Sequence, residues 1–209
     1  MFFEVVKPVE EETPVDFISD SDEEVVTAAI DDIKVSDKDS VIIGKGREGT
    51  ETLSTWTVEM PTSFFDGKTD AYVSLTMTDV SEDLPADIPE KRKEEIKDMT
   101  VISIMMVVGE TQTHSFDAPV TVKFAYTPKA GEDTGKLVVY YVNTETSALE
   151  RYDATYSDGF VIFETDHFSY WAVGEQSSGS DDDGLYLLVT IIIVIAAISA
   201  VGIVILRKN

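Results

Sequence analysis

A long uncharged segment near the C-terminus sets the strongest limit on the architecture of this chain. Residues 185–206 read LYLLVTIIIVIAAISAVGIVIL, and only Tyr186, Thr190 and Ser199 interrupt the apolar side chains. As a helix this segment is about 33 Å long, which is enough for the roughly 30 Å hydrocarbon layer of a bilayer. A buried helix of a globular domain rarely runs this long without a polar face. We therefore predict a transmembrane helix over residues 185–206, with the lipid bilayer as its partner.

The charges beside this segment predict its orientation. Asp181, Asp182 and Asp183 precede it, whereas Arg207 and Lys208 follow it. Basic residues stay on the cytoplasmic side, so residues 207–209 form a cytoplasmic tail and the N-terminal domain is extracellular. The beginning of the chain, MFFEVVKPVEEE, lacks the basic and apolar regions of a signal peptide. Two explanations stay open: the C-terminal part of a longer exported protein, or a tail-anchored protein whose domain is cytoplasmic.

Composition excludes several classes of function. The 209 residues include 40 acidic and 16 basic side chains, which gives a net charge of −24, and there is no cysteine. A nucleic-acid partner is not expected, because phosphate binding needs clustered Lys and Arg. Without cysteine the chain has no disulfide, thiolate metal site or cysteine nucleophile. Its two histidines, His114 and His167, are too few for a His-rich zinc site, and we expect no metal or cofactor.

The N-terminal region divides into an acidic segment and a helix. Residues 1–24 carry nine acids and one lysine, so they are predicted to be disordered for want of apolar surface to bury. Apolar residues then recur at helical spacing, which predicts a short amphipathic helix over Glu23–Lys34 that packs against the sheet after it. We expect residues 25–174 to form one ectodomain including this helix, and residues 175–184 (EQSSGSDDDG) to be a polar linker.

From residue 40 onward the dominant period is two. Residues 55–60, 73–78 and 120–126 alternate apolar and polar side chains, as half-buried strands do. Residues 101–108 and 137–142 are apolar on both faces, as expected of strands covered on both sides. Short turn sequences, among them Ser157-Asp158-Gly159, separate these runs. Residues 89–98 have the charges and leading proline of one or two helical turns. The pattern predicts a mainly β fold, an antiparallel β-sandwich over about residues 40–174.

Three runs in the second half of this domain follow a familiar pattern. They are DAPVTV at residues 117–122, LVVYYV at 137–142 and FETDHFSYWAV at 163–173. The pattern resembles the β-rich domain that closes many archaeal and Gram-positive cell-surface proteins, just before a membrane or wall anchor. The resemblance covers about residues 50–174. It implies a β fold at the cell surface and assigns no activity.

A second resemblance concerns three of these residues. His167-Phe168-Ser169 is similar to the His-[Leu/Phe]-[Ser/Thr] site of self-cleaving β-sandwiches, found in ankyrin/netrin-receptor-type domains and in the juxtamembrane domain of adhesion receptors. The resemblance implies that Ser169 Oγ attacks the Phe168 carbonyl, that His167 accepts the proton, and that water hydrolyses the ester. The paired cysteines that flank the site in adhesion receptors are missing here. The other interpretation places Phe168 and Tyr170 in the core, with His167 and Ser169 in local hydrogen bonds.

Other candidate sites have simpler interpretations. Acids in predicted turns have the chemistry of calcium ligands, but turn acids are usually only solvated; they are Glu132, Asp133, Asp153 and Asp158. Residues 44–50 (GKGREGT) lack the Gly-Lys-Ser/Thr ending of a phosphate loop. The sequence thus favours a non-enzymatic surface module, structural or adhesive, whose partners are other surface proteins or cell-envelope polymers. A self-cleaving domain and a cytoplasmic tail-anchored adaptor remain the alternatives.

Overall fold

The computed structural model describes residues 14–19, 23–36, 38–46, 56–69 and 71–176, and within them the chain is mainly β. The strands are β1 (Val15–Ser19), β2 (Val25–Ala29), β3 (Ser40–Lys45), β4 (Trp56–Pro61), β5 (Tyr72–Asp79), β6 (Thr100–Val108), β7 (Thr111–Thr113), β8 (Ser115–Ala125), β9 (Leu137–Val142), β10 (Leu149–Ser157), β11 (Phe160–His167) and β12 (Tyr170–Glu175). The helices are α1 (Ile30–Lys34) and α2 (Glu90–Ile96), and the 3₁₀ turns are η1 (Thr62–Phe65) and η2 (Thr134–Lys136). The predicted mainly β fold is confirmed.

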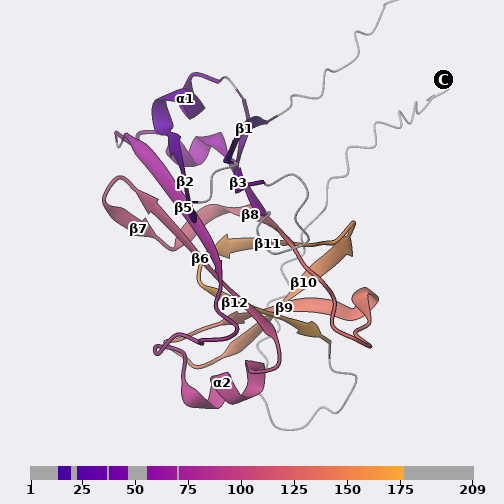
Figure 1. Ribbon diagram of the computed structural model, residues 1–209. Helices are drawn as coiled ribbons and strands as arrows, with labels where there is room; N and C mark the ends of the chain where they lie inside the picture. The colour runs from indigo at the N-terminus through magenta and orange to yellow at the C-terminus, as the bar shows by residue number, and fades with distance from the viewer. Residues whose placement is uncertain (1–13, 20–22, 37, 47–55, 70, 177–209) are drawn as a thin grey trace, which may run out of the picture.

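All these strands belong to one hydrogen-bonded sheet of 12 strands. Its order is β1-β3-β4-β8-β11-β10-β9-β12-β6-β5-β2, and β7 pairs with β6 beside this path. The parallel pair β1–β3 is the exception among the described strand pairs, which are otherwise antiparallel. The sheet curls so far that its first and last strands, β1 and β2, come close to each other (Figure 1). The result is close to a closed barrel.

Strand β10 joins the two layers of this barrel. Its first half, Leu149–Asp153, pairs with β9, and its second half, Ala154–Ser157, pairs with β11. The sequence predicts two separate sheets packed face to face, as in a sandwich. The structure shows instead one sheet that bends within β10, because a strand that bends can serve both layers.

The main hydrophobic core fills the space between the two layers. It takes every second residue from each strand, such as Val58 and Met60 from β4 and Val122 and Phe124 from β8. Trp171 from β12 is fully buried at its centre. Burial of one face of each strand explains the period of two in the sequence.

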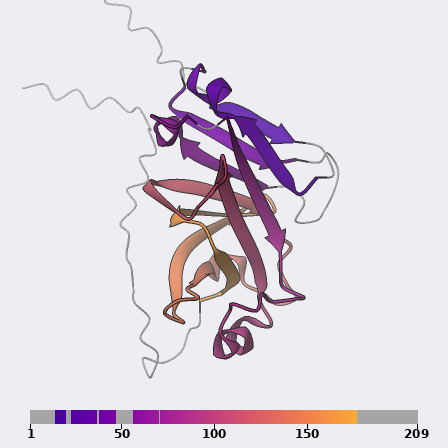
Figure 2. The ribbon, with the colours of Figure 1, turned by 90° about the vertical axis from the view of Figure 1, so that its left-hand side faces the viewer.

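A second, smaller core lies outside the barrel. Helix α2 and the segment before it bring Ile88 and Ile96 onto the outer face of β6, β9 and β12. There they meet Val101, Val142 and Ala172. The prediction that residues 101–108 and 137–142 have two covered faces is therefore confirmed where α2 lies, and the helical turns predicted over residues 89–98 are α2. Helices α1 and α2 lie at opposite ends of the molecule (Figures 1 and 2).

The turn between β10 and β11 is a tight hairpin. Two residues connect the strands, Asp158 with φ of 54° and Gly159 with φ of 84°. Positive φ at both positions is the requirement of a type I′ turn, and Asp-Gly is one of the sequences that meets it. The turn predicted at residues 157–159 is confirmed.

The helix predicted over Glu23–Lys34 is wrong in its first half. Residues 25–29 form β2, which pairs with β5, and the helix α1 begins only at Ile30. Buried Val26 and Ala28 alternate with Val25 and Thr27. β-branched residues favour a strand, and pairing with β5 overrides the helical spacing of the apolar side chains.

The disorder predicted for residues 1–24 is wrong for β1. Residues 15–19 pair with β3, and Val15 and Phe17 pack against the main core. This burial offsets the ordering of a segment that is acidic on average. Residues 1–13 and 20–22 lie outside the described residues.

The predicted membrane segment cannot be compared with the structure. Glu175 and Gln176 are the last described residues, so most of the predicted linker, residues 185–206 and the tail at 207–209 lie outside the described part. Among the helices that the structure does describe, none is both long and apolar enough to cross a bilayer.

We expect Gly44→Ala to destabilise the fold. Gly44 lies opposite Thr57 in the β3–β4 pair, and a Cβ there would lie 2.4 Å from the backbone oxygen of Trp56. The strands must separate to relieve this clash, so the free energy of unfolding should fall by about 2 kcal/mol, as in overpacked cores. Chemical denaturation measures it. Val25→Ala, at an exposed position, is the control and should change it by less than about 0.5 kcal/mol; equal stability of Gly44→Ala and the wild type would contradict this account.

Candidate functional site

The predicted site residues lie at a sharp corner of the chain. Phe168 and Ser169 alone connect β11, which pairs with β8 and β10, to β12, which pairs with β9 and β6. The chain therefore passes from one layer of the barrel to the other in two residues. The structure brings His167, Phe168 and Ser169 together at this crossing.

Thr165 shapes the corner. Its side chain is 1% exposed and is the buried polar residue of the described core. The Thr165 hydroxyl donates to the carbonyl oxygen of His167 at 2.9 Å and accepts from the His167 N–H at 3.1 Å. The register with β8 shifts between Thr165 and His167, as at a β-bulge. The hydroxyl thus satisfies backbone groups that the irregular pairing leaves without strand partners.

The His167 ring packs inside an aromatic cluster. Its centroid lies 4.1 Å from that of Tyr141, 5.3 Å from that of Trp171 and 5.8 Å from that of Tyr152. His167 Nδ1 lies 2.8 Å from Asp166 Oδ1. His167 Nε2 is buried and has no hydrogen-bond partner. The carboxylate therefore orients the ring, while the three aromatic side chains enclose it.

The Phe168–Ser169 peptide is held on both sides by backbone hydrogen bonds. The N–H of Phe168 donates to the carbonyl oxygen of His114 at 2.8 Å, and the carbonyl oxygen of Ser169 accepts from the N–H of Ile104 at 2.9 Å. The Phe168 ring is buried and contacts Phe116 edge to face at 4.7 Å. The Ser169 hydroxyl forms a hydrogen bond with the Tyr141 side chain.

This geometry determines what the corner can do chemically. An activated serine needs its hydroxyl within hydrogen-bond reach of a base. Here one ring nitrogen of His167 faces Asp166, the other has no partner, and the Ser169 hydroxyl is bound to Tyr141. Among the described residues other than glycine, positive φ is found at Ser147 and Asp158 and not at the corner. Self-cleavage stays a prediction, and the contacts favour an intact bond.

The pKa values of two tyrosines in the cluster, Tyr141 and Tyr152, are raised. Burial raises the pKa of Tyr141, and the charges of Glu150 and Glu145 add to the rise, while the hydrogen bond with Ser169 opposes it. Burial also raises the pKa of Tyr152, with Asp166 as the next cause. The ionised form of each phenol is disfavoured because it would lie in an apolar and negatively charged environment.

The interpretation that places Phe168 and Tyr170 on one core face is half correct. Phe168 lies in the main core, but Tyr170 belongs to the second core, where its hydroxyl binds both carboxylate oxygens of Asp87 at 3.1 and 3.2 Å. Trp171 takes the inward position instead. The corner between β11 and β12 interrupts the alternation, so the period of β11 does not continue into β12.

The other candidate residues are separated in the structure. Each acid considered as a calcium ligand contacts a neighbour in the fold: Glu132 binds Tyr126, Asp133 binds Lys136, Asp153 binds Arg151 and Asp158 binds Ser157. In the described part of the chain, no three His, Asp or Glu side chains lie close enough to hold a metal ion. Gly44 and Lys45 belong to β3, and residues 47–50 lie outside the described residues.

Sequence reasoning missed Thr165 and Tyr141 as members of the site. Thr165 lies two residues before His167. A threonine in a strand sequence gives no sign that its hydroxyl will bind backbone groups at a β-bulge. Tyr141 reaches Ser169 because β9 pairs with β12, with Trp171 opposite Tyr141. The spacing of residues along the chain gives no information about which strands pair.

We expect the protein to lose stability above about pH 10. The pKa values of Tyr126, Tyr141, Tyr152 and Tyr170 are raised in the fold, chiefly by burial. Unfolded tyrosines ionise near pH 10, so above it the unfolded chain binds fewer protons than the folded chain and stability falls with pH. Melting temperatures between pH 8 and 12 measure this loss.

Tyr152→Phe is the informative variant for this loss, because it keeps the ring and removes the ionisable group. Its melting temperature should fall less steeply over the same pH range. Tyr72→Phe, at an exposed ring, is the matched control and should behave as the wild type. An identical pH dependence of Tyr152→Phe and the wild type would show that burial of this phenol does not contribute.

We expect the Phe168–Ser169 bond to stay intact. The 209-residue chain should run as a single band on a denaturing gel, because neither ring nitrogen of His167 is hydrogen-bonded to the Ser169 hydroxyl. Ser169→Ala should give the same band. A fragment of residues 169–209 that is present in the wild type and lost in Ser169→Ala would reverse this conclusion and identify a self-cleaving site.

Comparison with known proteins gives this chain no family. No protein-family model matches the sequence, and no curated protein matches it. The similarity of residues 50–174 to anchored surface domains therefore stays a prediction. Function has to be inferred from the fold, the charge and the apolar segment at residues 185–206.

Proposed function

We propose that this chain is a membrane-anchored cell-surface module with a structural or adhesive role, and the C-terminal part of a longer exported protein. The observation that carries the proposal is the uncharged run at residues 185–206. It begins ten residues after β12 ends at Glu175, so a folded β domain is joined by a short polar segment to a transmembrane helix. This helix anchors the domain to the membrane. The domain, which precedes the helix in the chain, is extracellular.

The charges of the chain support this orientation. Arg207 and Lys208 follow the apolar run and stay on the cytoplasmic side. The domain and the segment before the run are acidic, so anionic headgroups repel them and the domain extends from the membrane surface. A domain held in this way presents its surfaces to other surface proteins or to polymers of the cell envelope.

The arrangement of the described residues supports a binding or structural role over catalysis. The His167 corner is filled by packed rings, and its hydroxyl and carboxylate groups bind neighbours within the fold. Asp133 at the start of η2 and Asp153 in β10 form local ion pairs, with Lys136 and Arg151. A tail-anchored adaptor in the cytoplasm is the competing function, and it differs in the side of the membrane on which the domain lies.

The absence of cysteine allows a direct test of topology. Thr111→Cys places a thiol at an exposed position of β7, and Lys208→Cys places one after the apolar run. On intact cells an impermeant maleimide should label Thr111→Cys, and it should label Lys208→Cys only after permeabilisation. These two variants act as controls for each other.

Two results would contradict the proposal. The opposite labelling pattern would identify a cytoplasmic tail-anchored protein. Recovery of the full-length chain in the soluble fraction after cell lysis would show that residues 185–206 do not anchor it. A variant that lacks residues 185–209 should leave the membrane fraction, and it provides the reference for that measurement.

A further inference from the structure

Four neighbouring strands carry almost no charge. Strands β2, β5, β6 and β7 pair in that order, and together they contain a single charged residue, Asp79 at the end of β5. The whole chain has a net charge of −24. We call the outward side of these strands the neutral face; it includes Val25, Thr27, Tyr72, Ser74, Thr76 and Met105.

One row on each layer shows how different the two outer surfaces are. On the neutral face, Thr76 of β5 lies between Val25 of β2 and Met105 of β6. On the other layer, Thr121 of β8 lies between Glu59 of β4 and Glu164 of β11. Both threonines are half-buried and central in their strands. One row is thus apolar where the other is acidic.

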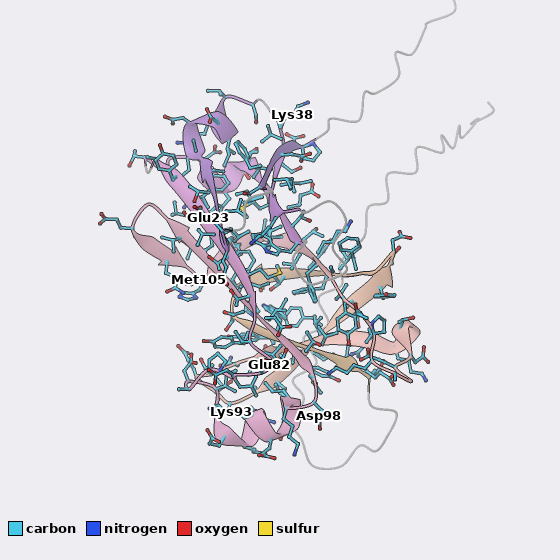
Figure 3. The ribbon with its side chains drawn as sticks, viewed as in Figure 1. Glu23, Lys38, Glu82, Lys93, Asp98 and Met105 are labelled. Atoms are coloured by element: carbon cyan, nitrogen blue, oxygen red, sulfur yellow. The ribbon has the colours of Figure 1, made fainter. Side chains whose placement is uncertain are left out.

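The neutral face mixes hydroxyl residues with three exposed side chains that are largely apolar. Val25 is 45% exposed, Met105 40% and Tyr72 56%. Helix α2 and the segment before it cover the other part of this layer's outer side, where the second core lies. Figure 2 looks at the side of the molecule on which β5 and β6 lie, and Figure 3 labels Met105 there. On a chain this acidic, an exposed surface without charge is a place where a partner can bind without electrostatic repulsion.

We propose that the neutral face is the contact between two copies of this chain. Two copies with a net charge of −24 each repel one another wherever acidic surfaces meet. The neutral face lacks that repulsion, and the same face of a second copy is a surface of equal size that also lacks charge. A two-fold axis through the row Val25–Thr76–Met105 brings the two faces together.

Polar groups on the face suit such a contact. Thr27 Oγ1 and Ser74 Oγ lie 3.1 Å apart and hydrogen-bond within the sheet. Hydroxyl groups donate and accept, so they can exchange bonds across two identical surfaces without leaving a charge buried. Acids border the face, with Glu24 before β2 and Glu110 in the β6–β7 turn, and they restrict the contact to the uncharged centre.

The size of the face sets the strength of the contact. Four strands about 4.8 Å apart and three rows of outward side chains cover about 400 Å². Standard stable interfaces bury about 800 Å² per partner. The contact between copies is therefore weak, and it strengthens with salt, which screens the repulsion of the surrounding acids. Its existence does not depend on membrane anchoring.

Cysteine cross-linking of the full-length protein in detergent micelles tests the contact. Thr76→Cys introduces the only thiol of the chain at the centre of the neutral face, and Thr121→Cys is the matched control in the acidic row. With a short bismaleimide, Thr76→Cys should form covalent dimers, with about tenfold higher yield than Thr121→Cys. The yield should rise between low and high salt.

A second substitution separates this face from other contacts. Met105→Glu in the Thr76→Cys background should lower the yield of cross-linked dimer about tenfold, because it puts two like charges into the interface. Its melting temperature shows whether the variant is folded, and Val25→Glu replaces it if it is not. Equal yields from Thr76→Cys and Thr121→Cys, or no dimer from Thr76→Cys, would overturn the proposal. The maleimide labelling of Thr111→Cys tests membrane topology independently of this result.

Discussion

The hydroxyl of Thr165 holds the corner on which the closure of the sheet depends. It binds both backbone groups of His167, and three residues later, at Tyr170, the chain begins β12. Strand β12 lies between β9 and β6, so it connects the part of the sheet that includes β9 and β10 to the part that includes β5 and β6. Without this last strand the barrel would be two pieces with open edges. A hydroxyl that satisfies two backbone groups in the core thus determines where the final strand lies.

Burial rather than ion pairing stabilises this acidic chain. The ion pairs Lys97–Glu94 on α2 and Lys136–Asp133 at η2 join residues three apart and are exposed to solvent, so they contribute little to stability. The excess of acids remains unpaired and has to be spread over the surface. The two layers share this charge unequally: glutamates border Thr121, while Val25 and Met105 border Thr76. The fold therefore places acids beside Thr121 and leaves the row through Thr76 without charge.

Local pattern predicted the parts of the fold that depend on local chemistry. Alternation located β4, β5 and β8, and Asp158-Gly159 located the hairpin between β10 and β11, because each depends on neighbouring residues. Residues 25–29 misled the prediction, since Val-Val-Thr-Ala-Ala fits the period of a strand and of a helix, and the partner strand β5 decides between them. The bend of β10 and the contact of Tyr141 with Ser169 depend on pairs distant in sequence. The aromatic neighbours of His167 come from β9, β10 and β12, and the spacing of residues along the chain does not reveal them for the same reason.

The central position of β12 has a mechanical consequence for an anchored domain. Tension from the membrane would enter the fold at Glu175, the end of a strand that is hydrogen-bonded along both edges, to β9 over six residue pairs and to β6 over four. A pull along the strand loads these bonds in shear, so they must break together rather than one after another from an edge. The buried Trp171 ring would also have to leave the core before β12 could slide. If residues 185–206 anchor the chain, force applied at Glu175 would be distributed across both neighbours of β12.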